Sequence, residues 1–157
     1  MNGKIPALVI IMFALLAGGA VYYLQEHAFY ETAAFTQGTE ISLTLIESGL
    51  PEPILAEAVE GIDADSSPLR FRACFRTPLT QAMLTETYKT YDGAVPLNAP
   101  SWFGCFDAAA IGAALEKGEA IAFLSEASIA PQVDRVVAVF PDGRAFAWHQ
   151  LSTDVEP

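Results

Sequence analysis

An uncharged apolar run near the N-terminus constrains this chain more than any other feature. It extends from Ile5 to Leu24. A helix rises 1.5 Å per residue, so the run spans about 30 Å, the thickness of the hydrocarbon core of a bilayer. Aromatic residues stand at its end and just beyond it: Tyr22, Tyr23, Phe29 and Tyr30. Because such side chains favour the membrane–water interface, we expect a transmembrane helix over residues 5–24 with these four residues at the interface.

The basic residues predict the orientation of this helix. Lys4 and the amino terminus precede the run, and the next basic residue is Arg70. The positive-inside rule therefore places residues 1–4 in the cytoplasm and exports the rest. A cleaved signal peptide is the alternative, with cleavage after Ala20. The apolar run continues to Leu24, past that site, which favours an uncleaved anchor. Either interpretation exports the domain.

The exported part is strongly acidic. All 19 acidic residues and all the basic residues except Lys4 follow the apolar run, which gives this part a net charge of −12 (7 basic minus 19 acidic). Such a charge repels nucleic acid and anionic lipid. We therefore expect no nucleic-acid partner, and a solvated acidic surface is the simplest interpretation.

Residues 39–157 are enough for one domain, and residues 25–38 are expected to form a juxtamembrane stalk. Alternating apolar and polar residues predict strands over 39–47, 54–61, 69–75, 120–125, 135–140 and 144–151. Residues 54–61 also fit a helix, and the flanking Pro53 and Gly61 favour a strand. Asp142 and Gly143 predict a tight hairpin between the last two strands.

Two helices are expected in this domain. Thr77 is a suitable N-cap with Pro78 at the first helical position, and that helix should end before Gly93. Asp107 should cap a second helix that stops at Gly118. Apart from the ambiguous residues 54–61, the sum is about five strands and two helices, which predicts an α+β fold with a mostly antiparallel sheet.

Cys74 and Cys105 are the two cysteines of the chain. In an exported domain a structural disulfide is the expected state of such a pair. Because no Cys-x-x-Cys spacing is present, a redox-active pair is a less favoured alternative, as are two reduced buried thiols.

Two groups of residues are candidates for an interaction surface. The first comprises Arg70, Arg72 and Arg76, which alternation places on one face of the strand over 69–75 and its end. They could recognise an anionic group or pair with the nearby acidic loop. The second comprises Trp102 and Phe103, which could pack around the disulfide or form a partner-binding patch.

Catalytic and metal sites are not indicated. His149 lies in a predicted strand and is interpreted as a residue of its polar face, while His27 belongs to the juxtamembrane segment. The loop from Asp63 to Ser67 departs from an EF-hand, because position 12 is Cys74 instead of glutamate. We therefore expect no catalytic residue, no metal and no cofactor.

Two stretches carry a resemblance to a known family. They are the opening Met-Asn-Gly-Lys with its apolar span into Tyr-Tyr-Leu-Gln, and residues 61–75, Gly-Ile-Asp-Ala-Asp-Ser-Ser-Pro-Leu-Arg-Phe-Arg-Ala-Cys-Phe. In these the chain resembles a family of short, uncharacterised membrane-anchored proteins of alphaproteobacteria. The resemblance implies a bacterial inner membrane and a periplasmic domain, and it implies no activity.

An anchor joined to a small domain favours a non-enzymatic accessory protein that binds another membrane or periplasmic protein. The alternatives are a periplasmic redox protein that uses Cys74 and Cys105, and a sensor domain for a small ligand. The sensor would need a partner to signal, since only four residues precede the apolar run.

Overall fold

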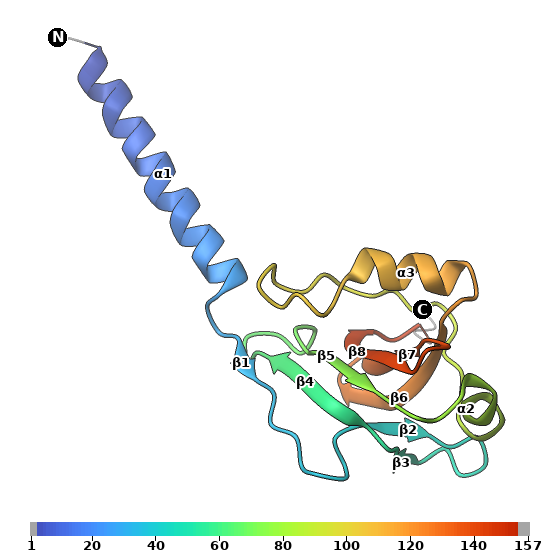
Figure 1. Cartoon of the computed structure of the whole chain (residues 1–157). Coiled ribbons are helices and arrows are strands. Elements are labelled where there is room, and N and C mark those ends of the chain that lie inside the picture. The colour runs from blue at the N-terminus through green and yellow to red at the C-terminus, as the bar shows by residue number, and fades with distance from the viewer. Residues whose placement is uncertain (1–2, 154–157) are drawn as a thin grey trace.

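The structure, a computed structural model, describes residues 3–153 (Figure 1). The predicted apolar helix is present as α1, Lys4–Glu26, which projects away from a folded domain. Its mean hydropathy is 2.3 and none of its span is buried, so it is long and apolar enough to cross a membrane. Nothing in the domain covers this apolar surface.

The domain is built on one antiparallel sheet of six strands in the order β1-β4-β5-β8-β7-β6. The bounds of these strands are β1 Glu31–Thr32, β4 Glu57–Asp63, β5 Arg72–Arg76, β8 Arg144–Leu151, β7 Val133–Val139 and β6 Ile121–Ala130. A separate hairpin pairs β2, Ser42–Thr44, with β3, Pro51–Pro53. Two short helices complete the domain, α2 at Gln81–Thr87 and α3 at Ala108–Glu116. The predicted α+β class is confirmed.

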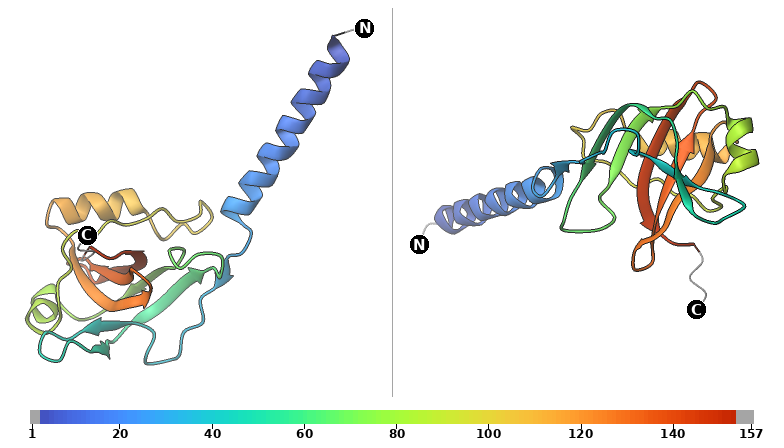
Figure 2. Two further views of the ribbon diagram at one scale, coloured as in Figure 1. Left: turned by 180° about the vertical axis from the view of Figure 1, so that it is seen from behind. Right: turned by 90° about the horizontal axis from the view of Figure 1, so that it is seen from below.

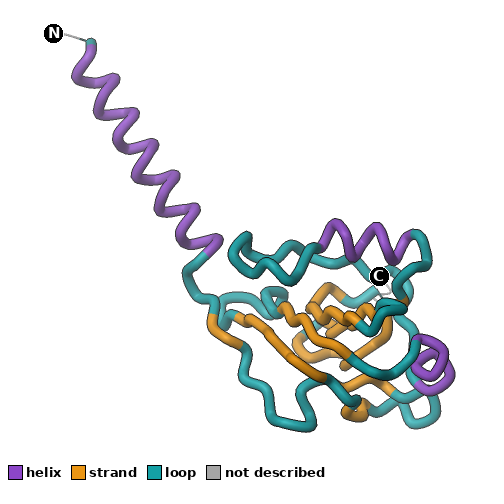
Figure 3. Tube along the Cα trace, in the orientation of Figure 1, coloured by secondary structure: helices purple, strands orange, loops and turns teal. Residues whose placement is uncertain are grey.

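Both faces of the six-stranded sheet are covered (Figures 1, 2 and 3). The β2–β3 hairpin and α2 pack on one face, where Leu43 and Leu84 meet Phe123 and Ala147. Helix α3 and the loop before it pack on the other, where Ile111 belongs to the same cluster as Trp148. Residues 145–150 of β8 are consequently all buried. The predicted division of strands into an apolar and a solvated face is therefore wrong at the centre of the sheet.

The predicted Asp-Gly hairpin is confirmed between β7 and β8. Gly143 has φ +83°, and a Cβ there would lie 2.8 Å from the Thr77 carbonyl oxygen, so glycine is required at this turn. The β6–β7 hairpin was not predicted. Its turn, Pro131-Gln132, lacks a glycine, and Gln132 itself adopts the left-handed conformation with φ +59°.

The first predicted helix is wrong in its start, and it ends before Gly93 as predicted but six residues short of it. Thr77 extends the sheet by donating its N–H to the Gly143 carbonyl, so α2 begins later, with Thr80 as the N-cap. The helix ends at Thr87 because the next residues pair with β6, where the Tyr91 N–H donates to the Ala122 carbonyl. The second predicted helix is confirmed. Asp107 caps α3, and Gly118 follows it with φ +71°.

Part of segment 25–38 packs against the domain instead of standing free. Glu31 and Thr32 form β1 and pair with the end of β4. Phe35 packs on the core and lies against Gly61, where a Cβ would meet its ring at 2.6 Å. The chain therefore enters the sheet within a few residues of the end of α1.

Candidate functional site

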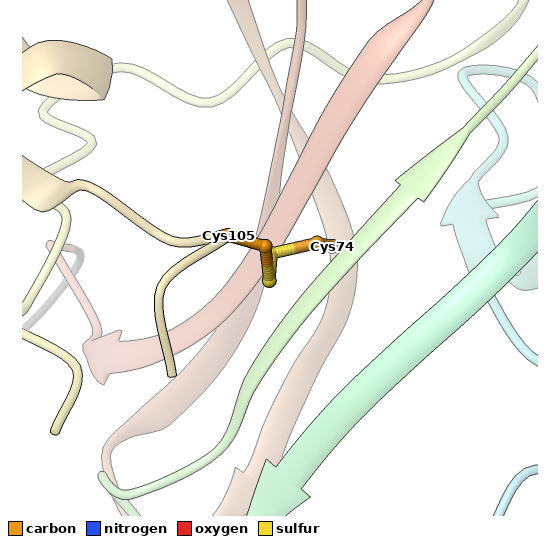
Figure 4. Close-up of a disulfide and its surroundings, with 2 residues drawn as sticks. All are labelled: Cys74 and Cys105. Atoms are coloured by element: carbon orange, nitrogen blue, oxygen red, sulfur yellow. A yellow bond between two sulfur atoms is a disulfide. The ribbon is translucent and has the colours of Figure 1, made fainter. Parts of the chain in front are cut away.

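The predicted disulfide is present between Cys74 and Cys105 (Figure 4). The two Cα atoms are 6.3 Å apart, within the usual range for a disulfide. Cys74 is buried on β5, whereas Cys105 is exposed. The bond attaches one end of a long segment, residues 93–106, to the sheet. We call this segment the disulfide loop.

Arg72 fixes the middle of the disulfide loop. Its guanidinium is buried and donates hydrogen bonds to the carbonyl oxygens of Leu97 (2.8 Å) and Asn98 (3.0 Å). It also donates to two carbonyls of its own chain segment, at residues 69 and 71. Burial lowers the pKa of Arg72 to about 10, so it stays charged at neutral pH. Arg72 thus lies inside the domain and not on an exposed arginine face.

Gln150 fixes the beginning of the disulfide loop. Its Oε1 accepts from the Val95 N–H at 2.8 Å and from the Trp148 indole N–H at 3.0 Å. Its Nε2 donates to the Gly93 carbonyl at 3.2 Å. Gln150, Arg72 and the disulfide therefore attach the loop to the sheet at its beginning, middle and end.

The tip of the disulfide loop contacts the end of α1 (Figure 1). The Ser101 N–H donates to a carboxylate oxygen of Glu26 at 2.8 Å, and the Trp102 indole N–H donates to the Glu26 carbonyl. The Trp102 ring also stacks on His27 and meets Tyr30 edge-on, with centroids 6.4 Å and 5.9 Å apart. A loop held on the sheet is thus joined to the last residue of the apolar helix.

The other predicted interaction residues are separated in space. The Arg70 guanidinium lies 5.1 Å from the centre of the Tyr30 ring, close to the end of α1. Arg76 is exposed at the far end of β5. Phe103 packs partly against the core and meets Trp102 edge-on. The structure therefore brings Arg70, Trp102 and Phe103 toward the end of α1 and leaves Arg76 apart.

A second polar cluster surrounds His149 of β8. This residue is 4% exposed, and its ring stacks on the ring of Phe71. Its Nδ1–H donates to the Pro68 carbonyl at 2.6 Å, and its Nε2 accepts from Arg135 Nε–H at 3.0 Å. Because a carbonyl cannot donate and arginine cannot accept, these two bonds require the neutral Nδ1–H tautomer. The interpretation of His149 as a residue of a polar face is wrong, since the Phe71 ring stacks on the imidazole with centroids 4.5 Å apart and both ring nitrogens are bonded inside the domain.

Burial lowers the pKa of His149 to about 4, and the charge of Arg135 acts in the same direction, outweighing the bond to Pro68. The pKa of His149 in the folded protein lies below the unfolded value of about 6.5. The contribution of the neutral histidine to folding stability is therefore complete above pH ~6.5 and is lost as the pH falls toward 4. We expect the free energy of unfolding to drop by about 2 kcal/mol between pH ~7.5 and pH ~5 because of this residue.

Chemical unfolding at both pH values, with His149→Gln as the control, measures this effect. Carboxylates titrate in both proteins, so the difference between their pH dependences isolates His149. Equal pH dependence in the two proteins would contradict the neutral buried histidine.

Among residues 3–153, no group of three or more His, Cys, Asp or Glu side chains is placed to hold a metal ion.

Comparison with known proteins gives one match. The model of a family of unknown function, DUF6446, matches residues 41–156.

The chain belongs to the DUF6446 family. The matched region begins after α1 and β1, so it defines the domain and not the apolar helix. It includes all three attachments of the disulfide loop, at Arg72, Gln150 and the Cys74–Cys105 bond. No curated protein and no solved structure matches the chain.

Proposed function

We propose that this DUF6446 protein is a membrane-anchored accessory protein whose periplasmic domain binds another membrane or periplasmic protein. Helix α1 supplies an anchor of the required length. The Cys74–Cys105 disulfide favours an oxidising compartment, and Lys4 before the helix favours a cytoplasmic N-terminus. In a bacterium these features correspond to the inner membrane and the periplasm.

The observation that carries the binding role is a set of exposed apolar side chains on the β2–β3 turn and α2, two elements at the end of the domain away from α1 (Figure 1). Ile46 and Leu50, in the β2–β3 turn, are 49% and 65% exposed, and Met83 of α2 is 55% exposed. The turn and the helix are joined, since the Ile46 N–H donates to the Thr87 carbonyl at 3.0 Å. We call these three side chains the distal corner. Neighbouring exposed apolar side chains on an otherwise acidic domain are typical of a protein-binding surface.

Site-specific photocrosslinking tests this role in native membranes. A photoreactive amino acid replaces Leu50 in one protein and Glu116, an exposed residue of α3 on the other face of the sheet, in the control. We expect one discrete crosslinked product from position 50 and none from position 116. The same product should co-purify in mild detergent at a native size above that of the single chain. A protein that migrates alone and crosslinks to nothing from position 50 would overturn the proposal.

A thiol-exchange function is the second candidate, and the exposure of Cys105 favours it. Cys105 lies two residues before the N-cap of α3, and helix N-termini stabilise thiolates. In a Cys74→Ala protein, such a function would leave Cys105 in a mixed disulfide with a substrate protein. A purely structural disulfide gives no mixed disulfide and only a loss of stability.

A further inference from the structure

With α1 across a bilayer, the tip of the disulfide loop would lie just beyond the hydrocarbon core. The uncharged run ends at Leu24, and Trp102 and Ser101 bond to Glu26, two residues further along α1. At 1.5 Å per residue the tip therefore lies about 3 Å beyond the hydrocarbon core. The headgroup layer on each side of that core is roughly 5 to 8 Å thick, so the tip falls within it.

The chemistry of the tip suits that layer. Trp102 is 45% exposed, and its indole N–H is already bonded to Glu26, which leaves its apolar ring surface to be covered. It joins the aromatic residues at the end of α1, through contacts with His27 and Tyr30. Tryptophan and tyrosine are the residues that concentrate at membrane interfaces, because one end of the ring is polar and the rest apolar.

We propose that the disulfide loop is a second membrane contact, which seats Trp102 among the headgroups of zwitterionic phospholipids and holds the domain against the bilayer. Zwitterionic lipid is the favoured surface because the exported part carries a charge of −12, and Glu26 lies at the contact itself. The attachments at Arg72, Gln150 and Cys105 fix the loop to the sheet. The membrane contact would therefore set the orientation of the whole domain.

The proposal rests on α1 acting as the anchor. Vesicle flotation combined with tryptophan fluorescence tests the anchor and the loop contact separately. The chain has two tryptophans, and the other, Trp148, is fully buried in the core. The full-length protein is reconstituted into phosphatidylcholine vesicles with and without lipids brominated along their chains near the headgroup. Vesicle flotation reports the anchor, and quenching by bromine reports the depth of Trp102. Trp102→Phe protein isolates the emission of Trp148.

We expect the brominated lipid to remove most of the Trp102 emission and to leave the emission of Trp102→Phe protein unchanged. A matched control combines Trp102→Phe with Val95→Trp. Val95 is exposed on the same loop but lies beside Leu115 and Ala120, away from α1. A tryptophan there should be quenched by aqueous acrylamide and not by brominated lipid.

Three outcomes would overturn the proposal. If the protein floats with the vesicles but aqueous acrylamide, and not bromine, quenches Trp102, the loop contact is wrong and the anchor stands. If bromine quenches a tryptophan at position 95 as strongly as Trp102, the contact is not specific to the tip. If the protein does not float, the anchor fails and the loop contact fails with it.

Discussion

Replacement of the disulfide by Cys74→Ala with Cys105→Ser is expected to lower the free energy of unfolding by about 3 to 4 kcal/mol. The two cysteines are 31 residues apart, and their bond restricts the unfolded chain by closing that long loop. Alanine suits the buried Cys74 and serine the exposed Cys105, so neither replacement introduces a buried polar group. Denaturant unfolding of the full-length protein in detergent, followed by tryptophan fluorescence, measures the loss.

The same change should free the tip of the disulfide loop from the end of α1. Emission from Trp102 should shift to that of a water-exposed indole, while that of the buried Trp148 should persist. Wild-type protein treated with a reductant is the control and should behave as the variant does. A loss of less than ~1 kcal/mol would show that the bond does not restrict the unfolded chain as argued.

Arg72→Met is expected to lower the free energy of unfolding by about 2 to 4 kcal/mol. The side chains are similar in length, but methionine donates no hydrogen bond. Four carbonyl oxygens, at residues 69, 71, 97 and 98, would lose their charged donor inside the domain. Methionine avoids the cost of burying a charge, which offsets part of this loss.

Arg76→Met is the matched control for Arg72→Met. Arg76 belongs to the same strand but is exposed, so its replacement should change stability by no more than about 0.5 kcal/mol. The two variants are compared by the same denaturant unfolding. Equal stability of the two would contradict the role given to Arg72 in holding the disulfide loop on the sheet.

Features fixed by a few neighbouring residues were predictable from the sequence. The uncharged length of 5–24 predicts α1, the Asp142-Gly143 pair predicts the β7–β8 hairpin, and Asp107 with Gly118 bounds α3. The disulfide also follows, because an exported chain with two cysteines has one possible pairing. Each of these depends on chain length, turn conformation or capping.

Features fixed by distant contacts were not predictable in this way. A prediction from alternating residues assumes that one face of each strand is solvated, and it therefore places Arg72 and His149 on polar faces. Both faces of this sheet are covered, and both side chains are buried. Thr77 has the residue type of a helix cap, but its N–H pairs with Gly143 instead. The contact between Trp102 and Glu26 joins two residues that are 76 positions apart in the sequence, and no local sequence pattern predicts it.

The redox state of Cys74 and Cys105 in intact cells is the most direct test of the proposal that the domain is exported and held by a structural disulfide. Cells that express the unaltered chain are quenched in acid and treated with a thiol reagent that retards migration on a gel. We predict a protein that is fully oxidised under all growth conditions and that the reagent modifies only after reduction. A chain with both thiols free in growing cells would contradict the proposed export of the domain.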